Sequence, residues 1–219
     1  MIDKCVASLA AAVAGVKDGD TVLCGGFGLV GEPVELIDAL NELDLRDLVV
    51  VANNAGTGEA GIAGLIKAGR VRKVICSYPR TMDPHVFEAF YKAGKIELEL
   101  VPQGTLSERM RAGGAGIGAF YTRSGAGTKL AEGKETREID GQLYVMEKPI
   151  KGDIALIRAL RADRWGNLVY RKSARNFNPV MAMAGRITAA QVSEVVELGT
   201  LDPECVHTPG IFVDRVVVV

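Results

Sequence analysis

The sequence has few of the residues on which metal and redox sites depend. It contains two histidines, and its four cysteines, Cys5, Cys24, Cys76 and Cys205, are widely spaced without a C-x-x-C pair. These counts argue against a zinc ribbon, a disulfide framework and a histidine-based metal site. Cys24 and Cys76 lie in apolar runs and are expected to be buried small hydrophobic residues.

Strong net charge and long apolar runs are missing too. The net charge is −1, so the chain has no basic field that would hold nucleic acid or an anionic membrane. No apolar run approaches the roughly 18 residues of a membrane-spanning helix. The first residues also lack the charged region and apolar core of a signal peptide. Together with the scattered cysteines, this predicts a cytoplasmic protein.

The chain is instead rich in apolar and small residues. Aromatic residues make up only 5% of it, but apolar residues make up 48%, and 26 of its 219 residues are glycine. This length fits one large domain, residues 1–219, better than two. Small residues that let backbones approach closely suit a layered α/β protein.

Strand-like and helix-like segments alternate along the first half of the chain. Strands are expected at residues 21–24, 48–52, 71–78 and 96–101, and helices at 3–16, 34–43, 60–68, 83–93 and 105–112. Short connections between them predict a Rossmann-like, doubly wound, mainly parallel sheet. A hairpin around Asp140 and Gly141, and late strands at 153–160, 187–196 and 211–219, predict a mixed or antiparallel portion. Residues 113–127 are expected to form a glycine-rich loop over the site or against another subunit.

Four glycines, Gly25, Gly26, Gly28 and Gly31, separate the first strand from a helix that begins near Pro33. A glycine loop before a helix N-terminus suits a phosphate, a carboxylate or an acyl oxygen. The match to the dinucleotide fingerprint is weak, because the next strand ends in two asparagines instead of an acidic residue. A tight turn without a ligand, and a stand-alone dinucleotide or sugar-phosphate module, remain alternatives.

Polar residues follow each of the four expected strands. Because the carboxyl ends of parallel strands meet at one edge, Gly25, Asn53, Arg80 and Gln103 are expected to lie at the same rim. Arg80 is suited to bind a carboxylate, with a solvated surface arginine as the alternative, and the Gln103 amide can donate to a carboxylate.

Three carboxylates, Glu32, Glu59 and Glu108, are expected on or near this rim. A structural role at a helix N-terminus is favoured for Glu32 and Glu108, which leaves Glu59 as a candidate nucleophile. No residue at the rim is an evident proton-transfer group. The sequence therefore indicates an anion-binding half of an active site.

Several longer motifs resemble the A (alpha) subunits of the class I coenzyme A transferases. They are residues 25–33 (GGFGLVGEP), 101–109 (VPQGTLSER), 112–116 (AGGAG), 173–179 (SARNFNP) and 207–213 (HTPGIFV). The resemblance implies that the catalytic glutamate lies on a B subunit, where it forms an acyl anhydride and then a glutamyl-CoA thioester. It also implies that this chain carries no catalytic residue and works in an A2B2 assembly.

The same resemblance assigns the binding residues. Coenzyme A is expected to contact Gly25, Gly26, Phe27, Gly28, Leu29, Val30 and Gly31, and the acid substrate is expected to contact Asn53, Asn54, Arg80 and Gln103. A coenzyme A thioester is then a substrate, and no metal or permanently bound cofactor is expected.

Three further stretches indicate the acceptor acid. Residues 53–59 (NNAGTGE), 76–80 (CSYPR) and 163–168 (DRWGNL) look most like family members that use 3-oxoadipate. This acid has a second carboxylate, which the guanidinium of Arg80 is suited to bind. Acetoacetate, acetate and short fatty acids remain alternative acceptors.

Overall fold

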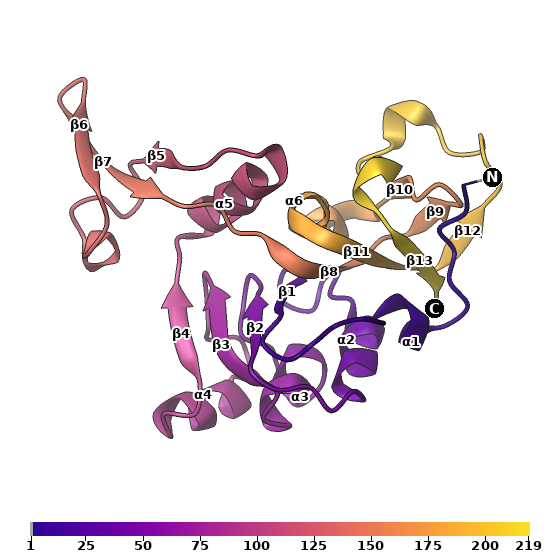
Figure 1. The fold of residues 1–219 in the computed structure, drawn as a ribbon, viewed down its shortest axis with the longest axis horizontal. Coiled ribbons are helices and arrows are strands. Elements are labelled where there is room, and N and C mark those ends of the chain that lie inside the picture. The colour runs from indigo at the N-terminus through magenta and orange to yellow at the C-terminus, as the bar shows by residue number, and fades with distance from the viewer. Residues whose placement is uncertain (1) are drawn as a thin grey trace.

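Seven parallel strands form the centre of the protein in the computed structural model, which describes residues 2–219 (Figure 1). The strands are β1 (Thr21–Cys24), β2 (Leu48–Val51), β3 (Val71–Cys76), β4 (Glu97–Leu100), β8 (Gly152–Arg158), β11 (Gly185–Val192) and β13 (Arg215–Val218). Their order is β13-β11-β8-β1-β2-β3-β4, and every neighbouring pair is parallel. The order reverses between β1 and β8, so the doubly wound sheet expected from the sequence is confirmed, with its switch point after β1.

Helices cover both faces of this sheet (Figure 1). One face carries α1 (Leu9–Ala12), α2 (Val34–Asn41), α3 (Gly61–Lys67) and α4 (His85–Lys92), and the other carries α5 (Gln103–Ala115) and α6 (Asn178–Ala184). Successive strand residues point to opposite faces, so Val22 and Cys24 join one buried cluster and Leu23 joins the other. A strand that is buried on both faces must be apolar throughout, which explains the continuous runs in the sequence.

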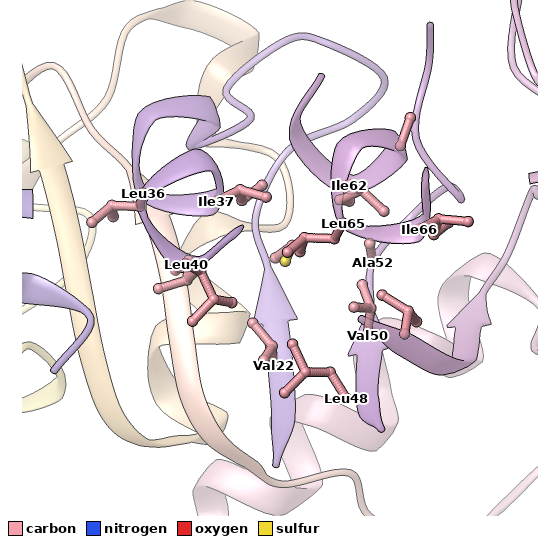
Figure 2. Close-up of a cluster of buried hydrophobic side chains, with 14 of the residues drawn as sticks. Val22, Leu36, Ile37, Leu40, Leu48, Val50, Ala52, Ile62, Leu65 and Ile66 are labelled. Carbon is pink, nitrogen blue, oxygen red and sulfur yellow. The ribbon is translucent and has the colours of Figure 1, made fainter. Parts of the chain in front are cut away.

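The larger of the two buried clusters packs β1 against α2, the elements before and after the glycine loop. Leu36, Ile37 and Leu40 of α2 are fully buried and lie in the same cluster as Val22 and Leu48 of the sheet (Figure 2). Burying a side chain of this size contributes about 1.5–3 kcal/mol. The loop between β1 and α2 is therefore fixed at both ends by the core.

Two small sheets with antiparallel pairs complete the fold. β5 (Phe120–Thr122), β6 (Thr136–Ile139) and β7 (Gln142–Glu147) form a three-stranded arm that projects from the body (Figure 1). β9 (Arg161–Asp163), β10 (Leu168–Val169) and β12 (Glu194–Val196) form the second. The predicted hairpin is confirmed, because Asp140 and Gly141 connect β6 to β7 with φ of 50° and 71°. Short 3₁₀ turns lie at Lys129–Ala131, Lys172–Arg175, Pro203–Cys205 and Gly210–Phe212.

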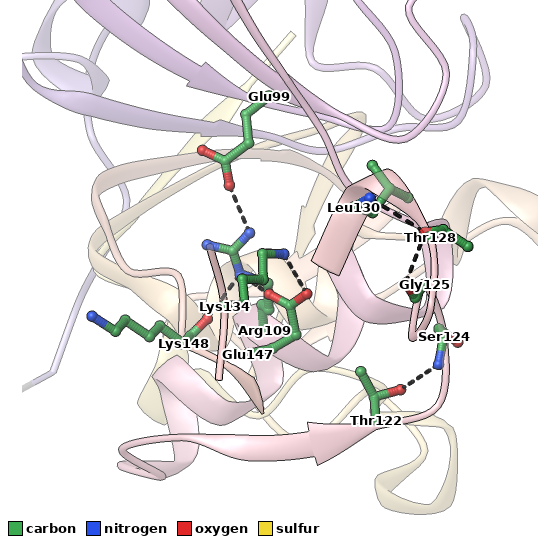
Figure 3. A network of polar contacts seen from close by, with 10 residues as sticks. All are labelled: Glu99, Arg109, Thr122, Ser124, Gly125, Thr128, Leu130, Lys134, Glu147 and Lys148. Carbon is green, nitrogen blue, oxygen red and sulfur yellow. Dashed lines mark hydrogen bonds and ion pairs between the residues drawn. The ribbon is translucent and has the colours of Figure 1, made fainter. Parts of the chain in front are cut away.

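A partly buried ion network joins the arm to the sheet (Figure 3). Arg109 of α5 donates from Nη1 to Glu99 Oε1 of β4 at 2.8 Å and from Nε to the carbonyl oxygen of Lys148 at 2.8 Å. Glu147, at the end of β7, is 3% exposed and accepts from Lys134 Nζ at 2.6 Å. Its other oxygen lies 3.8 Å from Arg109 Nε.

The expected helix at residues 3–16 is wrong over most of its length. Only Leu9–Ala12 is helical, and the Ser8 hydroxyl caps it by accepting from the Ala11 amide at 3.1 Å. Cys5 instead pairs with Val216 beside the sheet edge. A tertiary contact thus overrides the helical spacing of the apolar residues in this segment.

The expected loop at residues 113–127 is also partly wrong. α5 begins at Gln103 and continues through Gly113 and Gly114, so Thr105 is inside the helix and does not cap it. A methyl group on Gly113 would lie 2.1 Å from the Ile150 carbonyl oxygen, and one on Gly114 would lie 2.6 Å from that of Met183. Close packing of the helix therefore requires these glycines, despite their low helix propensity.

Late in the chain, residues 180–184 are part of α6, and the expected strand at 187–196 is divided into β11 and β12. Cys24 and Cys76 are buried and free, as expected. No helix within residues 2–219 combines the length and apolar character that crossing a membrane requires.

Candidate active site

The glycine loop closes on itself at the switch point of the sheet. The Phe27 amide donates to the Val30 carbonyl at 3.0 Å, and the Val30 amide donates back to the Phe27 carbonyl at 3.2 Å. Gly28 and Leu29 form the tip of this turn, where Gly28 has a φ of 59° and Leu29 is 63% exposed. The loop therefore presents apolar side chains outward from the carboxyl end of β1.

Asn178, the first residue of α6, connects this loop to the end of β8 through side-chain hydrogen bonds. Its side chain is fully buried, with Oδ1 accepting from the Arg158 amide at 3.0 Å and Nδ2 donating to the Gly31 carbonyl at 3.1 Å. A methyl group on Gly25 would lie 1.9 Å from Asn178 Oδ1, so only glycine fits there. Residues 173–179 stand out as a motif in the sequence, but this role of Asn178 was not predicted.

The N-terminus of α2 does not offer the anion site that the sequence suggested. Its Leu36 amide donates to Gln191 Oε1 of β11 at 3.1 Å, and Gln191 Nε2 in turn contacts the Glu35 carboxylate. The partial positive charge of this helix end is therefore already matched by groups of the chain itself.

Glu32 lies buried behind the loop with an unusual ionisation. It is 4% exposed, and among residues 2–219 its carboxylate accepts one long hydrogen bond, from the Ile62 amide at 3.5 Å. Burial raises the pKa of Glu32 from 4.5 to about 7, and the nearby Asp38 carboxylate adds to this effect.

Two amides form the polar centre of the rim. Asn53 Oδ1 accepts from Ser77 Oγ and from Gln103 Nε2, both at 2.8 Å. The Asn53 carbonyl also accepts from the amides of Ser77 and Tyr78, which ties the ends of β2 and β3 together. Gln103 is the first residue of α5, and no side chain of residues 2–219 caps this helix end. One N–H of the Gln103 amide is thus oriented by Asn53, which leaves the other for a ligand.

A cavity of about 600 Å³, here called the acyl cavity, opens beside these amides. It is lined by Phe27, Gly28, Leu29, Asn53, Asn54, Thr57, Ser77, Tyr78, Thr81, Met82 and Gln103. The structure therefore brings six of the expected site residues together, namely Phe27, Gly28, Leu29, Asn53, Asn54 and Gln103.

The remaining expected residues lie elsewhere. Val30 and Gly31 face a neighbouring cavity, and Gly25 and Gly26 lie behind the turn. Arg80 is 72% exposed and pairs with Glu88 Oε1 of α4 at 3.0 Å, so its guanidinium does not line the acyl cavity.

Five lining residues were not assigned from the sequence: Thr57, Ser77, Tyr78, Thr81 and Met82. All five follow β2 or β3, so their position after a buried strand was a usable signal. Tyr78 is 62% exposed and Met82 is fully exposed.

The lining of the acyl cavity is apolar with a few neutral polar groups. Among residues 2–219 it contains amides and hydroxyls, without a carboxylate, thiol, imidazole or amine. Glu59 pairs with Lys67 at 2.7 Å and with His85 at 3.5 Å, away from this lining. Within residues 2–219, no three His, Cys, Asp or Glu side chains gather closely enough to hold a metal ion.

Comparison with known proteins identifies the family of this chain. The family model described as coenzyme A transferase matches residues 6–219. The chain is 61% identical to the A subunit of 3-oxoadipate CoA-transferase from Pseudomonas putida, over all of this chain and 95% of that protein. It is 55% identical to the A subunit of succinyl-CoA:3-ketoacid coenzyme A transferase from Xanthomonas campestris, over 98% of this chain and 88% of that one.

Solved structures share the fold. An acyl-CoA transferase from E. coli O157:H7, solved as a thioester complex with CoA, superposes with a TM-score of 0.85 at 25% identity. All of this chain is covered, but it spans only half of that longer chain. Glutaconate coenzyme A-transferase from Acidaminococcus fermentans has a TM-score of 0.86 at 20% identity, over 98% of this chain and 75% of that one, which supports the fold alone.

The relatives are named as A subunits, which implies a partner B subunit, and family members use coenzyme A thioesters as substrates. The family expected from the sequence motifs is confirmed: this chain belongs to the coenzyme A transferase family, as an A subunit of the class I enzymes.

Proposed function

We propose that this chain is the A subunit of an enzyme that transfers coenzyme A from succinyl-CoA to 3-oxoadipate. Relatives at 61% and 60% identity carry the name of the A subunit of 3-oxoadipate CoA-transferase. The observation that carries the proposal is the Gln103 amide, held by Asn53 at an apolar cavity whose lining, among residues 2–219, contains no carboxylate. Residues 1–219 act as one subunit domain in an A2B2 assembly.

In this proposal the partner subunit's glutamate attacks the thioester carbonyl of succinyl-CoA. The anhydride that forms is attacked by the coenzyme A thiolate, which gives a glutamyl-CoA thioester and succinate. The carboxylate of 3-oxoadipate then repeats these steps in reverse. In each attack a carbonyl oxygen gains negative charge, which the free Gln103 N–H and the first turn of α5 stabilise.

Arg80 supplies the site for the second carboxylate. It precedes Thr81 and follows Tyr78 by two positions, and both of these line the acyl cavity. Its pair with Glu88 leaves the Arg80 side chain 72% exposed, and ion pairs that solvent screens contribute little to stability. The Arg80 guanidinium can therefore leave Glu88 and pair with a substrate carboxylate at little cost in free energy.

The test is transfer from succinyl-CoA to 3-oxoadipate and to acetoacetate, by the chain alone and co-expressed with a B subunit. The activity should require the partner and favour 3-oxoadipate. Arg80→Gln should lower kcat/KM for 3-oxoadipate about tenfold, as for loss of one charged hydrogen bond, and leave acetoacetate unchanged. Arg72→Gln, at an exposed position of β3, the strand that precedes Arg80, is the matched control. Activity of the lone chain would contradict the half-site, and Glu59 would then be the first residue to replace.

Acetoacetate is the second candidate acceptor. It is favoured by the absence of a cation from the lining of the acyl cavity and by the 55% identical relative that is named for 3-ketoacids. Equal loss of both activities in Arg80→Gln would support this alternative over 3-oxoadipate.

A further inference from the structure

Two asparagine side chains, here called the asparagine clamp, bind consecutive carbonyls of the glycine loop. Asn176 Nδ2 donates to the Val30 carbonyl at 2.9 Å, and Asn178 Nδ2 donates to the Gly31 carbonyl at 3.1 Å. The loop and the two asparagines are about 145 residues apart in the sequence, since these bonds span 146 and 147 positions. The clamp therefore joins the loop after β1 to the segment that leads into α6.

The clamp also fastens its own segment. A side-chain amide has two N–H donors, and the second donor of each asparagine binds a nearby carbonyl. These carbonyls belong to Ser173, at 2.9 Å, and Ala174, at 2.8 Å. The backbone beside them is strained, because Lys172 has a φ of 50°, in the left-handed region that a lysine rarely occupies. Strain that surrounding contacts maintain in this way is often associated with a functional site.

Asn176 acts on the turn that carries Phe27. The Val30 carbonyl accepts from the Phe27 amide at 3.0 Å as well as from Asn176. The side chains of Phe27, Leu29 and Val30 are all about half exposed or more, so burial of apolar surface contributes little to holding the turn. Hydrogen bonds to its backbone therefore determine where the turn lies.

The clamp lies next to the polar centre of the rim. Phe27, Gln103 and Asn176 line one small cavity of about 300 Å³. Phe27 and Gln103 line the acyl cavity too. A displacement of the turn would therefore change the space beside the Gln103 amide, and a misplacement of about 1 Å can slow an enzymatic reaction about 100-fold.

We propose that Asn176 and Asn178 are positioning residues for the transfer reaction, which act by holding Phe27 in place beside the Gln103 amide. This inference rests on the proposed function and adds the groups that keep the loop in its reactive position. Both asparagines give their N–H donors to carbonyls of the chain itself. Their loss should therefore slow the chemical steps more than it weakens substrate binding.

The experiment compares the unaltered chain with Asn176→Ala and Asn178→Asp, each assembled with its B subunit. Asn176→Ala removes one of the two donors to the Val30 carbonyl. Asn178→Asp keeps the shape of the side chain but turns an oxygen toward the carbonyls of Gly31 and Ala174. Both kcat and KM are measured with 3-oxoadipate and with acetoacetate, at a temperature where every variant is fully folded.

In both variants kcat should fall about tenfold or more, while KM for succinyl-CoA stays within about threefold of the unaltered value. Hydrogen exchange gives a second measurement that does not depend on turnover. The amides of residues 25–31 should exchange faster in both variants, whereas those of β2 should not change.

The matched control is Asn167→Ala, in the turn between β9 and β10. Asn167 also joins two segments, since Nδ2 donates to Asp163 Oδ2 and Oδ1 accepts from the Gly210 amide, both at 2.8 Å. The same change therefore removes similar hydrogen bonds away from the glycine loop. This variant should lose stability but retain kcat and the slow exchange of residues 25–31.

Four results would overturn the proposal. They are an unchanged kcat in Asn176→Ala, an equal loss of kcat in Asn167→Ala, a raised KM with kcat retained, and a lower kcat without faster exchange at residues 25–31. A raised KM would mean that the asparagines bind the substrate directly. If Asn178→Asp does not fold, Asn176→Ala decides the outcome, because Asn176 is only half-buried.

Failure of the proposed function would be recognised separately. An unaltered assembly that prefers acetoacetate would refute the proposed acceptor, but the ratio of variant to unaltered kcat would still test the clamp. An unaltered assembly that transfers coenzyme A to neither acid would refute both proposals.

Discussion

Replacing Glu32 with glutamine should remove much of the pH dependence of this protein's stability near neutrality. The Glu32 carboxylate lies behind the glycine loop, with the buried Cys24 thiol nearby. No lysine, arginine or histidine among residues 2–219 lies within 4.0 Å of it. An ionised carboxylate in this position is therefore poorly compensated.

The magnitude follows from the pKa. Below pH 4.5 the carboxyl is protonated in both the folded and the unfolded chain, so it carries no penalty. As pH rises toward 7, the unfolded chain loses this proton while the folded chain keeps it, and the free energy of unfolding falls. Above about pH 7 the loss is complete. A pKa raised from 4.5 to about 7 corresponds to about 3 kcal/mol.

The assay is urea unfolding of the unaltered chain and of Glu32→Gln between pH 5 and pH 8. The variant should gain stability relative to the unaltered chain by roughly 2–3 kcal/mol over this range. Glu42→Gln is the control. It removes the same charge at a position directly after α2, the helix that Glu32 precedes. A stability difference between Glu32→Gln and the unaltered chain that stays constant from pH 5 to pH 8 would refute the reasoning.

Three further substitutions test how the site and the arm are held. Gly25→Ala should cost about 1–3 kcal/mol in urea unfolding, and should also lower transfer activity, because its methyl group would lie 1.9 Å from a buried amide oxygen. Arg109→Ala should lower the free energy of opening of the arm by about 1–3 kcal/mol, because buried Glu147 loses a nearby cation. Hydrogen exchange should then become faster in β6 and β7 but not in β1. Gly113→Ala should destabilise by about 1–3 kcal/mol, whereas Gly118→Ala, with open space around it, should not.

The fold was predictable where the determining interactions are local or uniform. A strand such as β2 is buried on both faces, so it is apolar at every position and visible in the sequence. The structure of the segment around Cys5 was not predictable from the sequence, because its partner Val216 lies at the other end of the chain. The helical state of Gly113 was missed for a similar reason, since the carbonyl that requires this glycine belongs to Ile150.

The site was predictable in position more than in orientation. Asn53 and Gln103 follow strands whose ends meet at one rim, and their direct hydrogen bond agrees with that expectation. The direction of a long exposed side chain has no such constraint, and Arg80 turns to Glu88 of the following helix. The role of Asn178 required the three-dimensional fold, because its partners Arg158 and Gly31 come from separate strands and loops.

The position of β8 in the sheet has a consequence for synthesis of the chain. β1 pairs with β2 on one side and with β8 on the other, and the Thr21 amide bonds to Asp153, 132 residues later. A ribosome needs on the order of ten seconds to add that much chain. During this interval one edge of β1 has no strand to pair with, and such an edge is a template for aggregation. The nascent protein is therefore most vulnerable while its first half is complete and β8 is still to emerge, which is the period when a chaperone would protect it most.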